Sequence, residues 1–492
     1  MNQTWNTNKE HSGAQVPAWL VSVAFLGAAA ALAGGFWDDS WHTERGRDTF
    51  FVPPHIAIYA GVTVVGAALS LWMLQVAYRG GTRAVLRNPV MLLATGSVAV
   101  TLLSGPIDNA WHEAFGRDAV AWSPPHMLGL VGLLGLAASL LAMLSDRRIL
   151  GPSAGALVIA AATFGVFEYD TDVPQFDSVW YLPALALGAS IAAVLVQLTS
   201  PRRWSVSAAA TVHLAFLGGV SLFLLGVGFP PPALPLLVFP ALALDLARAR
   251  SLGVNAQTAL FVVVLYAVYV PVRNFLGDGV SIDALDIAFG LPLALVAVRG
   301  VFQIADTRRK TSRQTSPALA AVGTSLVLLL VGAPVALAHD PGQGDPAGAA
   351  RLEVTARGDV AQLNGAWLAP SCRRQPIGGE VVARRGGQER RARLRLQGCS
   401  FTGSVALPSR GRWFVYMDLR DGERHVESWL PVHNTADGER VTEPRRYAYE
   451  PRKADSSLVK YFSGALLYAG MVALLLTTIA VLRRVAGGSA PA

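Results

Sequence analysis

The sequence predicts an α-helical polytopic membrane protein of about twelve spans, with a small β-sandwich domain outside the membrane between the last two spans. Of its 492 residues, 52% are hydrophobic and only 15% are charged. The apolar residues form long blocks, and a membrane span needs about 20 of them. One segment near the C-terminal end differs, because it is polar, basic and alternating in hydrophobicity. These observations together predict helices in a membrane and one separate β domain.

Apolar segments long enough to cross a membrane follow one another along most of the chain. Residues 1–16 are polar, and the first apolar run is long enough to remain as an anchor, so we expect no cleaved signal peptide. The predicted spans are 17–36, 54–78, 89–107, 124–144, 149–167, 180–199, 205–228, 232–247, 256–272, 281–300, 317–338 and 459–482.

The positive charges predict how these spans are oriented. Arg and Lys gather in alternate connections, whereas the remaining connections are mostly acidic or neutral. The basic groups are Arg79, Arg83 and Arg87; Arg147 and Arg148; Arg202 and Arg203; Arg248 and Arg250; Arg308, Arg309, Lys310 and Arg313; and Arg483 and Arg484. Positive loops face the cytoplasm, so both termini are expected inside and residues 339–457 outside a plasma membrane. The net charge of +8 is thereby explained by loops and by the basic segment, with lipid rather than nucleic acid as the partner.

The chain therefore divides into six expected parts. They are a cytoplasmic tail (1–16), two duplicated helical hairpins (17–145), further membrane helices (146–316), a span (317–338), an extracytoplasmic β domain (339–457) and a C-terminal span with its tail (458–492). The apolar run before His339 also resembles an internal signal peptide, so cleavage there is an alternative to an uncleaved span.

The segment 339–457 has the pattern of a small β-sandwich. Residues 412–420 alternate between apolar and polar side chains, and Asp421-Gly422 supplies a turn signal. Several such short strands with regular turns favour a sandwich. The chain has only two cysteines, Cys372 and Cys399, and both lie in this segment. Outside the membrane they could form a disulfide that closes a loop of about 27 residues, worth roughly 3–4 kcal/mol. Two free thiols are the alternative.

Two stretches among the first four spans repeat one pattern of polar residues. The first contains Asp38, Trp41, His42, Gly46, Arg47, Asp48, Pro53, Pro54 and His55. The second contains Asp108, Trp111, His112, Gly116, Arg117, Asp118, Pro124, Pro125 and His126. The offset is 70 residues up to Asp118 and 71 afterwards, so the second loop carries one extra residue. We interpret the repeat as an internal duplication.

The repeated residue types favour a metal site in each hairpin. Asp38 and His42 are four residues apart and so lie on one face of a helix. His55 follows Pro-Pro at the start of the next helix, where the helix dipole disfavours a charged imidazole and leaves the ring able to bind metal. Asp108, His112 and His126 repeat the arrangement. One carboxylate and two imidazoles suit copper, iron or zinc.

Other interpretations of these residues stay open. The Asp and His side chains could simply pair with one another at the membrane interface. A b-type haem between His55 and His126 would leave Asp38 and Asp108 unexplained. The pairs Arg47–Asp48 and Arg117–Asp118 are expected to order the loops around the metal. Further along the chain, Asp170, Asp172 and Asp177 have the look of a decayed third copy without histidines, and His213 is expected to be a hydrogen-bonded core residue.

The motif Asp38-x3-His42-x12-His55 resembles the first copper motif in the C-type membrane subunit of the particulate methane and ammonia monooxygenases, the copper membrane monooxygenase family. Asp108-x3-His112-x13-His126 is similar to the second motif of the same protein, which opens with Asn where this chain has Asp108. The resemblance covers roughly residues 17–145. It implies copper at both positions and a possible role in hydroxylating ammonia, methane or a short alkane with dioxygen. It also implies partner subunits or self-association.

Two function classes remain open from the sequence. In one, the chain is a copper-dependent membrane monooxygenase or a fused relative, because it extends well beyond the resembling segment and carries its own outer domain. In the other, it binds and passes on copper without oxygenase turnover. An inert structural membrane protein is the third interpretation.

Overall fold

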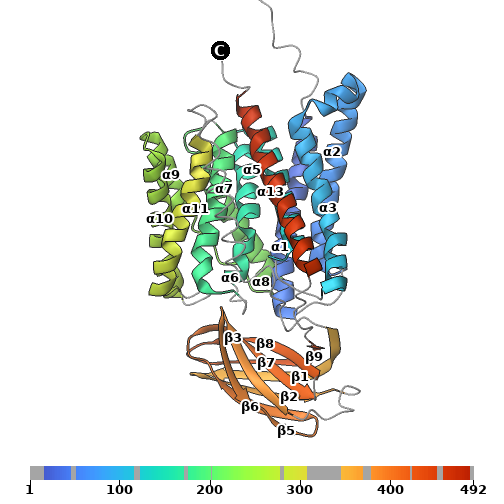
Figure 1. The fold of residues 1–492 in the computed structure, drawn as a ribbon, viewed down its shortest axis with the longest axis vertical. Coiled ribbons are helices and arrows are strands. Elements are labelled where there is room, and N and C mark those ends of the chain that lie inside the picture. The colour runs from blue at the N-terminus through green and yellow to red at the C-terminus, as the bar shows by residue number, and fades with distance from the viewer. Residues whose placement is uncertain are drawn as a thin grey trace, which may run out of the picture.

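The computed structural model describes residues 16–45, 51–115, 122–170, 176–200, 202–276, 282–306, 345–368, 378–421, 424–450 and 458–487. These residues form a helical bundle and a β domain that lies at one end of it (Figure 1). Within this described part, ten helices are long and apolar enough to cross a membrane. The multi-pass, membrane-protein-like architecture is therefore confirmed.

The helices follow the predicted spans closely in most places. Their bounds are α1 Ala18–Arg45, α2 Pro53–Leu86, α3 Pro89–Phe115, α4 Pro124–Leu144, α5 Leu150–Thr163, α6 Phe167–Asp170, α7 Tyr181–Thr199, α8 Ser205–Gly226, α9 Val238–Ala249, α10 Val254–Leu276, α11 Ala284–Asp306 and α13 Leu458–Gly487. Short 3-10 turns at Phe164–Val166 and Ser178–Trp180 lead into α6 and α7. The predicted span 317–338 lies outside the described residues.

The eighth predicted span, 232–247, is wrong as a continuous helix. Residues 229–236 form no helix, and α9 has only 12 residues, or about 18 Å of helix against a hydrocarbon core of about 30 Å. The cause is a run of prolines, since proline lacks an N–H and keeps the preceding residue out of the helical region. Hydrogen bonds to other helices satisfy this backbone: Ser40 donates to the Pro230 carbonyl at 2.8 Å, and the Leu236 N–H donates to the Tyr269 hydroxyl at 2.9 Å.

The β domain is a single antiparallel sheet of nine strands in the order β4-β3-β7-β8-β9-β1-β2-β6-β5. The strands are β1 Asp345–Arg357, β2 Val360–Trp367, β3 Gly378–Arg385, β4 Gln388–Arg393, β5 Arg395–Gln397, β6 Ser400–Ala406, β7 Gly411–Asp421, β8 Arg424–Asn434 and β9 Glu439–Glu450. Where two separate sheets were expected, one continuous sheet curls until β4 and β6, near its opposite edges, are in contact. Strand twist allows this closure, and the sheet is held at its weakest join, between β8 and β9, by the single pair Glu427–Tyr449.

The two faces of the curled sheet have different partners. The predicted alternation in 412–420 is confirmed, because Trp413, Val415 and Met417 lie in the enclosed core. The opposite face carries a smaller apolar cluster of Val382, Phe414, Tyr416, Trp429 and Tyr449. Arg412, on that same face of β7, forms an ion pair with Glu44 at the end of α1, and Arg446 donates to the Glu44 carbonyl. The outer face of the sheet is thus fixed against the bundle.

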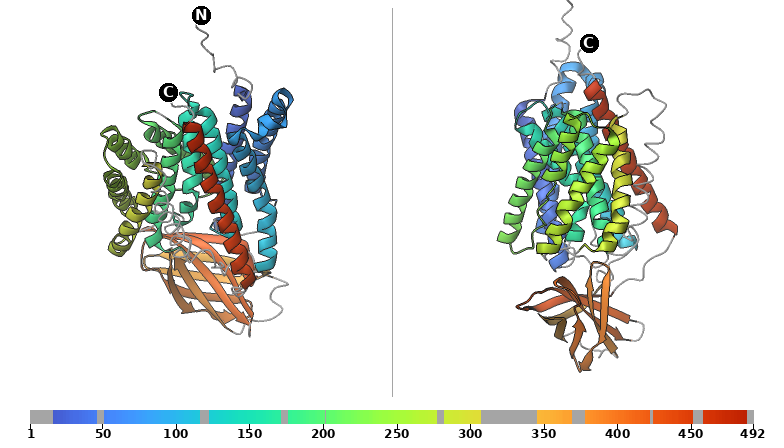
Figure 2. Two further views of the ribbon diagram at one scale, coloured as in Figure 1. Left: turned by 45° about the horizontal axis from the view of Figure 1, so that its top comes forward. Right: turned by 90° about the vertical axis from the view of Figure 1, so that its left-hand side faces the viewer.

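The direction of the helices brings the duplicated loops to the β-domain side. Helix α1 begins, and α13 ends, at the end of the bundle away from the β domain (Figures 1 and 2). The last turns of α1 therefore lie next to the sheet. After the β domain, α13 packs on α4, where the Tyr468 hydroxyl donates to the Trp122 carbonyl at 2.9 Å.

The duplication extends to the way each hairpin packs. A Cβ on Gly61 would lie 2.8 Å from the amide nitrogen of Ala31, so α1 and α2 are in direct backbone contact. In the second hairpin, a Cβ on Gly132 would lie 3.1 Å from the amide nitrogen of Thr101. Ala31 and Thr101 are 70 residues apart, and Gly61 and Gly132 are 71 apart, so the same positions make the same close approach. Small residues at these positions let two apolar helices approach closely in a membrane.

Candidate metal centre

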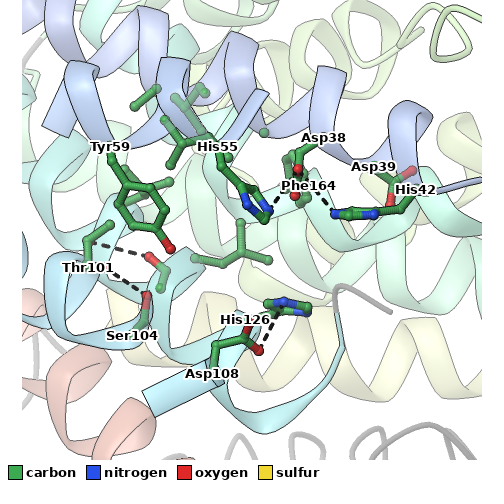
Figure 3. Close-up of a pocket in the computed structure, with 17 residues that line it drawn as sticks. Asp38, Asp39, His42, His55, Tyr59, Thr101, Ser104, Asp108, His126 and Phe164 are labelled. Atoms are coloured by element: carbon green, nitrogen blue, oxygen red, sulfur yellow. Dashed lines mark hydrogen bonds and ion pairs between the residues drawn. The ribbon is translucent and has the colours of Figure 1, made fainter. Parts of the chain in front are cut away.

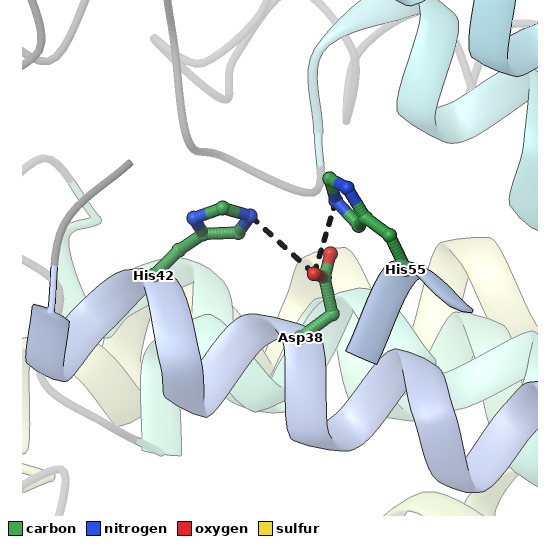
Figure 4. Close-up of side chains that lie close together, drawn as sticks. All are labelled: Asp38, His42 and His55. Carbon is green, nitrogen blue, oxygen red and sulfur yellow. Dashed lines mark ion pairs between the residues drawn. The ribbon is translucent and has the colours of Figure 1, made fainter. Parts of the chain in front are cut away.

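Asp38, His42 and His55 converge at the β-domain end of α1 and α2 (Figure 4). The His55 Nε2 lies 3.1 Å, and the His42 Nε2 3.4 Å, from the same carboxylate oxygen, Oδ1 of Asp38. The two histidine side chains are 8% and 12% exposed, and that of Asp38 is 21% exposed. The three predicted ligands therefore lie together, and their side chains are largely buried.

Local sequence explains this convergence. Asp38 and His42 share one face in the last turns of α1 because they are four residues apart. Val52 is extended and the prolines that follow it occupy the first positions of α2, so His55 stands in the first turn of that helix. The end of α1 and the start of α2 lie side by side, so all three side chains face one point.

The spacing of the donor atoms suits one ion. Two ligand atoms held about 2.1 Å from the same metal, at angles of about 90–110°, lie roughly 3.0–3.4 Å apart. The separations of 3.1 and 3.4 Å in the structure fall in this range. A suitable ligand atom from each of the three residues also lies within 4.8 Å of the others. Two imidazoles with one carboxylate are a donor set that fits copper, iron or zinc.

The second hairpin repeats the contact between Asp and His, as far as the structure describes its residues. The His126 Nε2 lies 3.2 Å from Oδ1 of Asp108, on α4 and α3 respectively. His112 lies on α3 one turn after Asp108, and its side chain is outside the described residues. Each of the histidines proposed for a haem, His55 and His126, is thus directed at its own aspartate. This pairing supports two similar sites more than one haem between them.

Residues of both hairpins line one cavity of about 110 Å³ (Figure 3), namely Asp38, His42, His55, Asp108 and His126. Its polar wall includes Tyr59, Thr101 and Ser104, and its apolar wall includes Leu133 and Phe164. An apolar cavity of about 150 Å³ can hold benzene, so this one has room for a smaller molecule of a few heavy atoms. The two halves of the duplication therefore share one small, mostly apolar space.

Sequence reasoning missed Asp39, which also lines this cavity and is buried. Its Oδ2 has no hydrogen-bond partner among the described residues. A buried carboxylate within an apolar helix is costly, and such residues are often functional. The adjacent Asp38-Asp39 pair in an otherwise apolar run was the available signal. Tyr59 and Phe164 could not be found in this way, since each belongs to an ordinary apolar stretch.

Several predicted features lie outside the described residues. They are Arg47, Asp48, Arg117 and Asp118, the junction at His339, and Cys372. Cys399 is in the turn between β5 and β6. The disulfide between Cys372 and Cys399 stays a prediction, as does the role of the two Arg–Asp pairs.

The acidic residues interpreted as a third copy have other partners where the structure describes them. Asp170 forms an ion pair with Arg273 at 2.9 Å, and the Asp177 side chain accepts from the Val179 N–H at 3.1 Å. His213 is buried as expected, but neither ring nitrogen has a hydrogen-bond partner among the described residues. It lines a second cavity, of about 30 Å³, with Asp170 and Arg273. That volume is enough for a water molecule.

Comparison of the chain with protein-family models, with curated proteins and with solved structures finds no match.

Proposed function

We propose that this protein binds copper in its membrane domain, with one site in each duplicated hairpin. Asp38, His42 and His55 would hold one ion, and Asp108, His112 and His126 the other. The observation that carries the proposal is the convergence of the first trio on one point at ligand-like separations, with the Asp–His contact repeated in the second hairpin. Ion pairing alone does not require the same contact at both copies.

The choice of copper over iron or zinc depends on the motifs. Imidazole nitrogens suit all three metals, and copper has the highest intrinsic affinity for such sites among the first-row divalent ions. The two unequal intervals, x12 and x13, are those of the copper motifs in the C-type membrane subunit of the particulate monooxygenases. Asp108, in place of Asn, adds a negative charge that would strengthen binding of a cation at the second site.

We further propose that the site hydroxylates a small substrate such as ammonia, methane or a short alkane. Bound copper would supply the activation of dioxygen. The chain itself would exclude bulk water with the apolar side chains around the cavity, such as Leu133 and Phe164. The cavity volume of about 110 Å³ restricts the substrate to a few heavy atoms. Tyr59 and Asp39 offer the polar groups that could orient a substrate or take up a proton.

Copper handling without turnover is the second candidate function. It is favoured by one observation: Asp108 and His126 line the same cavity as the first trio, so an ion released from one site could be captured by the other. The location of this cavity at the β-domain end of the bundle suits capture of copper outside the membrane. The corresponding orientation, with both termini cytoplasmic and the β domain outside a plasma membrane, belongs to the same proposal. So do the Cys372–Cys399 disulfide and a topology of twelve crossings, of which the interrupted segment 229–249 would make the eighth.

Metal analysis of the purified, detergent-extracted chain tests the proposal. We expect bound copper in the wild type, the loss of one site in H42A/H55A and of the other in H112A/H126A, and loss of most copper when all four are replaced. The control is H433A, because His433 is a half-exposed histidine of the β domain. Unchanged copper in the fourfold variant would refute both candidate functions.

Turnover distinguishes the two functions. The copper-loaded wild type is given dioxygen, a quinol and either small hydrocarbons or ammonia, and oxidised products are measured. A product that disappears in H42A/H55A supports the monooxygenase. Bound copper without product under any donor supports copper handling.

A further inference from the structure

A second group of candidate ligands lies in the β domain, on neighbouring strands of the sheet. Asp418 is on β7, and His425 and Glu427 are on β8. The His425 Nε2 lies 2.5 Å from Oδ1 of Asp418 and 3.4 Å from Oε1 of Glu427. One ligand atom from each residue lies within 4.8 Å of the others. The cluster shares no residue with the helical centre.

The register of the sheet fixes this arrangement. Asp418 is paired directly with Glu427, and Arg420 with His425, across the antiparallel strands. Directly paired residues project from the same face, and so do residues two apart on one strand. All three side chains therefore belong to one face, held by backbone hydrogen bonds and not by a mobile loop. A site built on strands in this way is largely preorganised.

Burial makes the two carboxylates costly without a cation. The side chains of Asp418 and Glu427 are each 1% exposed. Like charges directly opposite each other in a sheet are destabilising, and buried charges are normally paired or bound to a metal. His425 is 34% exposed, so an ion could enter from its side.

Three arginines surround the cluster. Arg384 lies 3.4 Å from Oε2 of Glu427, and Arg391 lies 3.9 Å from Oδ2 of Asp418. These are the carboxylate oxygens turned away from His425, whereas Oδ1 and Oε1 are the ones that face it. Arg384 and Arg391 are closer to Glu389, at 2.8 and 2.6 Å. Arg420 alone approaches the inner oxygen of Asp418, at 4.0 Å. The arginines thus leave one oxygen of each carboxylate directed at the imidazole.

We infer that Asp418, His425 and Glu427 form a second metal site, which binds a divalent first-row cation such as Zn²⁺ or Mn²⁺. Two carboxylates and one imidazole are harder donors than the helical trios, and carboxylates favour such ions. Three protein ligands leave a position open for water, as in sites that are not purely structural. The ion would join β7 to β8 on the face that contacts the end of α1. The alternative to a metal ion at this site is a proton on His425, which would make its ring an imidazolium between the two carboxylates.

The test uses the purified full chain with Zn²⁺ as the probe. Zinc content is measured after equilibration and gel filtration for the wild type, for D418N/E427Q and for H425A. The matched control is E353Q, which removes a carboxylate from an exposed pair of the same domain, Glu353–Arg440. We expect one zinc equivalent to be lost in D418N/E427Q and in H425A and kept in E353Q, with copper content equal in all four proteins.

A second measurement protects the test against misfolding. If D418N/E427Q does not give a monodisperse protein, H425A decides, because it keeps both carboxylates and alters a partly exposed side chain. Mn²⁺ is then added as an independent probe, followed by electron paramagnetic resonance. Equal zinc and manganese binding by the wild type and H425A would overturn the proposal and leave the imidazolium as the occupant. Loss of copper only in the helical variants would still support the function proposed above.

Discussion

The imidazole Nε2 of His55 lies 3.1 Å from Oδ1 of Asp38, although the two residues belong to different helices. Their contact therefore depends on how closely α1 and α2 approach each other. The approach is set further along the hairpin, where a Cβ on Gly61 would lie 2.6 Å from the carbonyl oxygen of Gly27. The close approach of the helices and the metal-binding residues are thus parts of one arrangement, which the second hairpin repeats with Ser97 in the place of Gly27.

Replacing Gly61 or Gly132 by valine should separate the helices of the corresponding hairpin. The added side chain would meet the backbone of the facing helix, so we expect each variant to lose about 1–3 kcal/mol of stability and to bind less copper at its own site. The control is G96V, because a Cβ on Gly96 in α3 meets nothing within 4 Å. Thermal unfolding in detergent and copper content measure the two effects. G61V or G132V behaving like G96V would contradict this account of the hairpins.

Local patterns in the sequence predicted those parts of the site that depend on local structure. The four-residue spacing of Asp38 and His42 and the prolines before His55 fix helix faces and helix starts, so the first trio could be foreseen. The cavity could not be predicted, because Phe164, which lines it, comes from a 3-10 turn far along the chain. Hydrophobicity alone also made 232–247 a continuous span, whereas the prolines delay the start of the helix to Val238.

The β domain shows the same limit. Alternation identified the strand around Trp413, and the Asp421-Gly422 turn signal marked the end of that strand. The ion pair between Arg412 and Glu44 joins residues more than 300 positions apart in sequence. No periodicity indicates such a contact. The trio of Asp418, His425 and Glu427 was missed for another reason. Its ligands lie on two paired strands, and the spacing of residues within one strand does not predict which residues of the other strand lie opposite.

Glu439 should give the β domain part of its sensitivity to acid. The hydrogen bond from the His433 side chain lowers the pKa of Glu439 below its ordinary value of 4.5. A carboxylate with a lowered pKa stabilises the folded state above the pKa that it has when unfolded, and this contribution is lost as the pH falls through the folded value. We therefore expect E439Q to be less stable than the wild type at pH 7 and to lose less stability below about pH 4.5.

Thermal unfolding between pH 3 and pH 7 checks this expectation. E353Q is the control, because it removes a carboxylate of the same domain whose partner, Arg440, is exposed. Parallel stability curves for E439Q and the wild type across the acid range would contradict the assigned role of Glu439.

Removal of the Glu44 carboxylate should weaken the attachment of the β domain to the bundle. Arg412 is buried, and burial lowers the pKa of its guanidinium to about 10. In E44A this charged group would keep its buried position without its partner. Breaking a buried ion pair costs about 3–5 kcal/mol, and the partial exposure of Glu44 places the expected loss near the lower limit.

The exposed pair of Glu353 and Arg440 provides the comparison, since E353A should cost less than about 1 kcal/mol. Chemical unfolding of the full chain, followed by tryptophan fluorescence, measures both losses. The double variant E44A/R412M should recover most of the stability lost in E44A, because it also removes the unpaired charge. If E44A loses no more stability than E353A, the Glu44–Arg412 ion pair does not hold the sheet against α1. The sheet face that carries the proposed second metal site would then not be fixed beside the helical metal centre.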